Sequence, residues 1–175
     1  VPRYLKQQDD YAAAVALLDA GKYDEAESAF TALGSYGDAE EYAEKTVPYK
    51  KALYIMDCAR NDDVAGLLAL GLKRSDVAEG ETVSVALYRE ADKLFAALGD
   101  YADCAAQRET AQKAIADYFD EQKRGAYDAA QALLDEGCYL KARDAFLAMG
   151  NYKDSADMAK ESMYRRAVAL CDVID

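Results

Sequence analysis

Apolar residues recur at helical spacing in two adjacent stretches near the start of the chain. Ala14, Leu17 and Leu18 are three or four residues apart and fall on one face of a helix. A second stretch has a matching face, formed by Tyr23, Ala26, Phe30 and Leu33. Gly21 lies between them and can adopt the positive φ that ends a helix. The pattern predicts an antiparallel helix hairpin with Ala26 and Phe30 in its core.

The same hairpin pattern returns later in the chain. Residues 127–155 align with residues 11–39 without a gap, which predicts that Ala142 and Phe146 are also core residues. The pairs shared are Tyr11/Tyr127, Ala14/Ala130, Leu17/Leu133, Leu18/Leu134, Gly21/Gly137, Tyr23/Tyr139, Ala26/Ala142, Phe30/Phe146, Gly34/Gly150, Tyr36/Tyr152 and Asp38/Asp154. Residues 88–104 repeat only the second half, and a Tyr-x-x-Ala pattern starts again at Tyr49 and at Tyr164.

A Gly-x-Tyr-x-Asp motif closes each copy, at residues 34–38, 99–103 and 150–154. Its glycine is expected to end a helix and its tyrosine to cover the end of the hairpin. Its aspartate is expected to accept hydrogen bonds from the free backbone N–H groups of the next helix. Glu41 and Asp157 follow three residues later, where they suit a capping box or a favourable charge near a helix start.

The small, large, glycine and aromatic positions of this unit resemble those of the tetratricopeptide (TPR) family. The residues that carry the resemblance are Ala14, Leu17, Gly21, Tyr23, Ala26, Phe30 and Leu33. The unit departs from that family by ending in LGxYxD followed by Ala or Ser instead of proline, and by repeating every 37 or 38 residues. It is similar to divergent repeats in large proteins of Gram-positive bacteria. The resemblance implies an all-α, TPR-like superhelix, or solenoid, of antiparallel hairpins in a bacterial protein.

A single TPR-like repeat domain is expected to occupy residues 1–175. It comprises a repeat at 11–48, a degenerate middle at 49–126, a repeat at 127–163 and the start of a further repeat at 164–175. About nine helices are expected, at 9–20, 23–33, 38–59 with a bend at Pro48, 62–70, 82–98, 102–123, 126–136, 139–149 and 154–173. Residues 71–81 combine glycines and charges without an apolar period, which predicts an exposed and mobile insertion.

Composition narrows the classes of function. The 21 basic and 33 acidic residues give a net charge of −12, which disfavours nucleic acid and anionic lipid as ligands. No apolar run reaches the roughly 20 residues of a membrane helix, so a soluble segment is expected, in a compartment that the sequence does not specify. The chain has no histidine and no phosphate-binding glycine loop, so no metal, cofactor or catalytic residue is expected.

The four cysteines are isolated in the sequence and are expected to be free thiols, with disulfides as the alternative. Burial is expected for Cys58, Cys104 and Cys171, whereas Cys138 lies in a turn and should be partly exposed.

These exclusions favour a non-catalytic scaffold that binds a protein or peptide, within a larger bacterial protein. The resemblance places the first helix of each pair along an inner groove. The groove candidates are Tyr11, Val15, Leu18, Tyr49, Tyr127, Gln131 and Tyr164, with Asp135 beside them. The TPR clamp for a C-terminal carboxylate does not carry over, because its polar positions hold Tyr11, Ala12 and Val15. Three alternatives remain: tyrosines that only pack on neighbouring repeats, a structural spacer and, distantly, an all-α enzyme.

The end of the chain resembles the first helix of a pair whose second helix does not follow. Its apolar stripe consists of Tyr164, Ala167, Leu170, Val173 and Ile174. Because exposed apolar surface forfeits roughly 25 cal/mol per Å² of burial, this helix is expected to dock on something. The candidates are another chain, further sequence, or a second copy, which would make a homo-oligomer.

Overall fold

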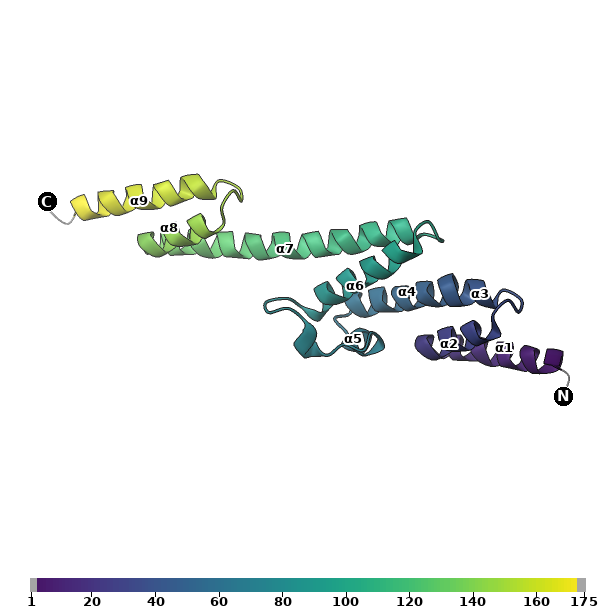
Figure 1. Ribbon diagram of the computed structural model, residues 1–175. Helices are drawn as coiled ribbons and strands as arrows, with labels where there is room; N and C mark the ends of the chain where they lie inside the picture. Colours follow the sequence, from purple (N-terminus) through teal and green to yellow (C-terminus); the bar gives the residue numbers. More distant parts are fainter. Residues whose placement is uncertain (1–2, 173–175) are drawn as a thin grey trace. The chain divides into compact units, whose positions relative to one another are not determined.

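The protein is all-helical over residues 3–172, the part that the structure, a computed structural model, describes (Figure 1). No strand occurs in this range, as the sequence predicted. The N-terminal elements are α1 (Arg3–Asp19), α2 (Tyr23–Leu33), α3 (Ala39–Glu41), the π-helical turn η1 (Tyr42–Thr46), α4 (Val47–Arg60), α5 (Ala65–Ala69), the 3₁₀ turn η2 (Arg74–Asp76) and α6 (Val83–Leu98). They are followed by α7 (Cys104–Asp135), α8 (Tyr139–Ala148) and α9 (Ser155–Cys171).

The chain divides into two compact units, Val1–Ile115 and Ala116–Asp175. In the first unit, α1 packs on α2 and α4 packs on α6, while α2 also contacts η1 and α4. In the second unit, α8 packs on α9. The helix α7 supplies Cys104 and Ala111 to a core of the first unit, and Ala130 and Leu134 to the core of the second.

The predicted hairpin cores are confirmed. Ala26 and Phe30 have no exposed surface and pack with Ala14 and Leu18 of α1. Ala142 and Phe146 are equally buried in the second unit. Gly21 and Gly137 adopt positive φ at the turns between the paired helices, which is the conformation that glycine permits at lowest cost. The local pattern therefore predicted each hairpin together with its core.

Two predicted helix boundaries are wrong. The helix α1 begins at Arg3 instead of residue 9, although residues 3–8 lack a clear apolar period. The predicted helices at 102–123 and 126–136 form one continuous helix, α7, of 32 residues. Gly125 does not break it, because one glycine inside a helix costs only about 1 kcal/mol and good helix formers surround this one.

The middle of the chain contains a third hairpin, formed by α4 and α6. Its core joins Ile55 and Met56 of α4 to Leu87, Ala91 and Phe95 of α6. Residues 61–82 connect the two helices in place of the short turn found in the other hairpins. The segment described from the sequence as a degenerate middle is therefore a hairpin of the same type with an insertion between its helices.

The insertion is more closely packed than predicted. Most of residues 71–81 are exposed, as expected, but Leu72 and Val77 are half-buried against the α4–α6 core. Glu81 accepts two hydrogen bonds of 2.6 Å from the Arg89 guanidinium, and its side chain is 13% exposed. At the other end, Asp62 accepts hydrogen bonds from the backbone N–H and hydroxyl of Ser84. These contacts attach both ends of the insertion to α6.

A π-helical turn explains why the first repeat is 38 residues long and the last is 37. Tyr11 and Tyr49 are 38 positions apart, whereas Tyr127 and Tyr164 are 37 apart. The extra residue lies between α2 and α4, where η1 occupies Tyr42–Thr46, and α9 has no such turn. A π-helical turn accommodates one extra residue without ending the helix. The bend predicted at Pro48 is thus replaced by an irregular turn just before it.

The π-helical turn also fixes the correspondence between the helix α3–η1–α4 and α9. Before the turn, Ala39 and Ala43 correspond to Ser155 and Ala159; after it, Val47 corresponds to Ser162. All six residues are buried. Continuing past the turn, the equivalent pairs are Tyr49/Tyr164, Ala52/Ala167, Ile55/Leu170 and Met56/Cys171.

Candidate functional site

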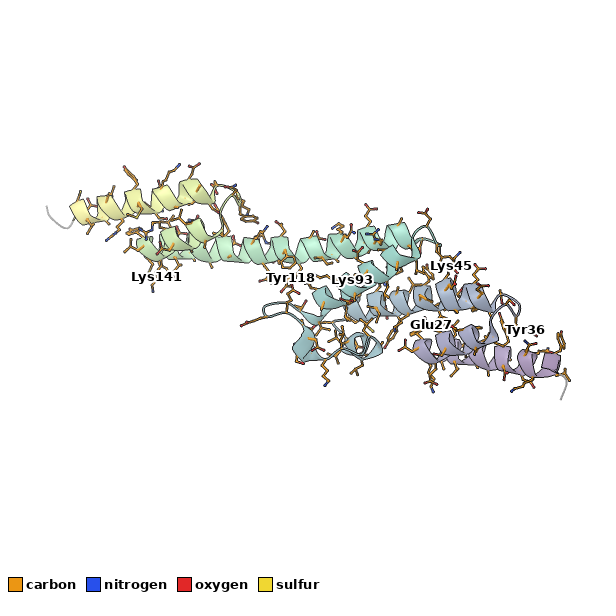
Figure 2. The ribbon with its side chains drawn as sticks, viewed as in Figure 1. Glu27, Tyr36, Lys45, Lys93, Tyr118 and Lys141 are labelled. Atoms are coloured by element: carbon orange, nitrogen blue, oxygen red, sulfur yellow. The ribbon has the colours of Figure 1, made fainter. Side chains whose placement is uncertain are left out.

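A cluster of four side chains closes each of the three hairpins. A tyrosine from the first helix meets the phenylalanine of the second helix and the tyrosine and aspartate of the Gly-x-Tyr-x-Asp loop. The clusters are Tyr11, Phe30, Tyr36, Asp38; Tyr49, Phe95, Tyr101, Asp103; and Tyr127, Phe146, Tyr152, Asp154. Figure 2 labels Tyr36 at the end of the first hairpin.

The ring geometry is nearly the same in each cluster. Ring centroids of the first-helix tyrosine and the phenylalanine are 5.5 Å apart for Tyr11–Phe30, 6.1 Å for Tyr49–Phe95 and 5.5 Å for Tyr127–Phe146. All three contacts are edge-on, an arrangement that aromatic quadrupoles favour. The repeated tyrosines therefore close their own hairpins.

The loop aspartates bind tyrosine hydroxyls instead of helix N–H groups. Tyr11 donates to Asp38, Tyr49 to Asp103 at 2.5 Å and Tyr127 to Asp154 at 2.6 Å. Neither Asp38 nor Asp154 caps the following helix through its side chain. The predicted side-chain caps are therefore wrong for these two aspartates, and no capping box forms with Glu41 or Asp157. Both acidic residues lie in the first turn of the following helix, which confirms the alternative prediction of a favourable charge near a helix start. Asp157 also pairs with Lys160.

These hydrogen bonds raise the pKa values of the three tyrosines and lower the pKa of one aspartate, Asp103. The bond to Asp103, together with burial and the charge of that carboxylate, raises the pKa of Tyr49 to about 12. The equivalent bonds to Asp38 and Asp154 raise the pKa values of Tyr11 and Tyr127. The bond from Tyr49, followed by one from Gln107, lowers the pKa of Asp103. The charged carboxylate and the neutral phenol are thus the stable pair at neutral pH.

The predicted groove residues therefore differ in what they can offer a partner. Leu18 is 4% exposed in the first hairpin core, so it presents almost no surface. Val15 is half-buried against the same core, and the Gln131 side-chain amide donates to Asp135. The hydroxyls of Tyr11, Tyr49 and Tyr127 are already bonded. Tyr164, at 64% exposure, is the most open member of the set.

Exposed apolar side chains gather on α9. Met163, Tyr164, Val168 and Leu170 are 36%, 64%, 42% and 56% exposed. Ala167 and Cys171 are exposed as well, so the predicted burial of Cys171 is wrong, whereas Cys58 and Cys104 are buried and Cys138 is half-buried, as predicted. We call Tyr164, Ala167, Val168, Leu170 and Cys171 the α9 stripe. Val173 and Ile174 of the predicted stripe lie outside the described residues.

Two shallow pockets lie between the start of α8 and the α9 helix. One is lined by Tyr139, Tyr164, Arg165, Val168, Ala169 and Asp172. The other is lined by Gly137, Cys138, Tyr139, Leu140, Lys141 and Arg166. Lys141 is labelled on α8 in Figure 2. The second pocket has Lys141 and Arg166 in its lining and no acidic residue, although acidic residues predominate in the whole chain. We call these two side chains the basic border of the apolar surface.

Within residues 3–172, no three side chains of the His, Cys, Asp and Glu types come together as metal ligands. No helix of the described part has both the length and the apolar character needed to cross a membrane.

Comparison with protein-family models, curated proteins and solved structures found no match for this chain.

Proposed function

We propose that this chain is a non-catalytic, TPR-like repeat scaffold that binds a protein or peptide, and that the α9 stripe is its main binding surface. The observation that carries the proposal is the exposure of neighbouring apolar side chains on one helix, led by Tyr164 and Leu170. Contiguous exposed apolar surface is typical of interaction sites, whereas a spacer gains nothing by exposing it.

The arrangement of hairpins supports the scaffold role. Three helix pairs of one type follow each other along the chain, as expected for a solenoid of antiparallel hairpins. Tyr164 belongs to the tyrosine row proposed from the sequence, and it is the member whose hydroxyl and ring stay available. The binding surface is thus a part of the predicted groove, centred on the last helix.

The basic border suggests the chemistry of the partner. Lys141 and Arg166 line one pocket beside the stripe, and among the described residues neither makes an ion pair. An apolar helix or peptide with acidic residues along its flank would complement this border and associate faster at low salt. A partner of this kind uses the helix-in-groove mode of recognition.

The test is an unbiased selection of displayed 20-residue peptides on the full chain. Selected peptides are expected to bind at least ten-fold more weakly to the Leu170→Asp variant. Leu68→Asp is the matched control, because Leu68 is a 71% exposed leucine on α5, outside the stripe. Circular dichroism checks that both variants keep their helix content. Absence of selected binders, or binders that tolerate Leu170→Asp, would contradict the proposal.

A further inference from the structure

We infer that the α9 stripe is the docking surface for one kind of partner, the second helix of a repeat of this same type. The inference rests on the proposed function and names the occupant of that site. It starts from the residue-by-residue correspondence between α9 and the helix α3–η1–α4. This correspondence holds both before and after the π-helical turn. Both helices bury their N-terminal residues against the hairpin that precedes them.

The C-terminal halves of these two helices carry apolar residues at equivalent positions but differ in what covers them. Ala52, Ile55 and Met56 of α4 have no exposed surface, because α6 packs on them. Their equivalents Ala167, Leu170 and Cys171 are exposed. The α9 stripe is therefore the α4 interface without its α6. A capping helix of a repeat array normally has a polar outer face, whereas the outer face of α9 is apolar.

The covering helix has the same residue pattern wherever it occurs in the chain. The pattern is Ala-x-x-x-Phe-x-x-x-Gly-x-Tyr-x-Asp, found at residues 26–38, 91–103 and 142–154. In each case its aspartate accepts the hydroxyl of a first-helix tyrosine, namely Tyr11, Tyr49 and Tyr127. Tyr164 is the fourth tyrosine of this series and makes no hydrogen bond within the described residues.

This regularity specifies what the occupant must supply. Its alanine lets the two helices approach closely, and its phenylalanine packs beside Tyr164. Its glycine ends the helix so that the following tyrosine and aspartate turn back towards α9, where the aspartate accepts the Tyr164 hydroxyl. The negative charge of this loop aspartate also complements the positive charges of Lys141 and Arg166 at the border of the surface.

The probe is a fluorescent peptide of residues 83–103, which are α6 and its loop. A lactam between Lys93 and a glutamate introduced by Ala97→Glu keeps the peptide helical, because isolated helices of this length are marginal in water. Both positions are exposed in the parent hairpin, and Lys93 is labelled in Figure 2. Binding to the full chain is measured by fluorescence anisotropy.

The peptide is expected to bind, and Leu170→Asp in the chain or Phe95→Ala in the peptide to weaken binding at least ten-fold. Loss of the hydroxyl in Tyr164→Phe, or of the acceptor carboxylate in the Asp103→Ala peptide, should each weaken binding roughly three- to ten-fold. The two changes together should cost little more than one alone, because they remove the same bond. Leu68→Asp again serves as the control.

The inference is overturned by the absence of binding by the helical peptide, by equal binding of the Phe95→Ala peptide, or by additive effects of the last two changes. A stable dimer in sedimentation analysis that Leu170→Asp dissociates would show that a second copy occupies the stripe instead. Selected library peptides that need Leu170 but lack the alanine–phenylalanine pattern would overturn this inference and leave the proposed function standing.

Discussion

The helices α4 and α9 occupy the same place in the repeat but end up in different surroundings. Ile55 of α4 is fully buried, whereas its equivalent Leu170 of α9 is 56% exposed. Tyr49 donates its hydroxyl to Asp103, and its equivalent Tyr164 has no such acceptor among the described residues. The residue pattern of a helix therefore makes one face suitable for burial, and a second helix decides whether that face is buried.

The largest expected difference lies between Ile55→Ala and Leu170→Ala. Ile55→Ala removes a buried side chain and leaves a cavity, so it should lower the free energy of unfolding by about 2–5 kcal/mol. Leu170→Ala should change it by less than about 0.5 kcal/mol, because the side chain is in water. Urea unfolding measures both values, with hydrogen exchange to follow each unit. A loss of more than about 2 kcal/mol for Leu170→Ala would mean that α9 is covered in the isolated chain.

Substitutions of Gly66 and Gly125 test how tightly the insertion, residues 61–82, packs against the C-terminal end of α4. A Cβ atom on Gly66 would lie 2.8 Å from the Cys58 Cβ atom and 2.9 Å from Leu87 Cδ1. Gly66→Ala should therefore destabilise the protein by about 1–3 kcal/mol through overpacking. Gly125→Ala in α7 is the control, because a Cβ there meets nothing within 4 Å.

Removing the helix penalty of Gly125 should stabilise the protein by roughly 0.5–1 kcal/mol. Thermal unfolding, followed by circular dichroism, distinguishes the two glycine variants. The midpoint temperature of unfolding should fall for Gly66→Ala and rise for Gly125→Ala. If Gly66→Ala were neutral or stabilising, the contact of α5 with α4 and α6 would be looser than the structure shows.

The smallest effect concerns the hydroxyl of the paired tyrosines. Tyr49→Phe should cost about 0.5–1.5 kcal/mol, since it removes a hydrogen bond to a carboxylate, and Tyr164→Phe should cost almost nothing. The pKa of Tyr49 is raised to about 12 in the folded chain, above its ordinary value near 10. Its contribution is therefore full below about pH 10 and disappears as the pH rises towards 12.

The contribution of Asp103 to the stability of the protein has the opposite pH dependence. Its pKa is lowered in the folded chain, so its contribution is full above about pH 4 and is lost as the pH falls. Unfolding free energies of Tyr49→Phe and the unchanged chain should therefore converge at both pH extremes. A difference between them that does not vary from pH 3 to pH 11 would show that the hydrogen bond does not form.

Local sequence information predicted the helices and their cores. The three- and four-residue spacing around Phe30 and Phe146 placed these residues inside, and the structure confirms it. The expectation of helix ends at glycines is confirmed at Gly34 and Gly99, which both adopt positive φ. Gly125 shows the limit of this reasoning, because a glycine ends a helix only when its neighbours favour ending it.

The helical class, the hairpin unit and the core of the first and last hairpins could thus be predicted from the sequence alone, because these features depend on contacts between helices that are adjacent along the chain. The role of the loop aspartates and the burial of each equivalent face depend instead on contacts between segments that are distant in the sequence. Asp38 could have capped a helix, but Tyr11 reaches it across 27 residues. Likewise Ile55 and Leu170 carry the same apolar signal, and only the presence of α6 beside one of them separates a core residue from a surface residue.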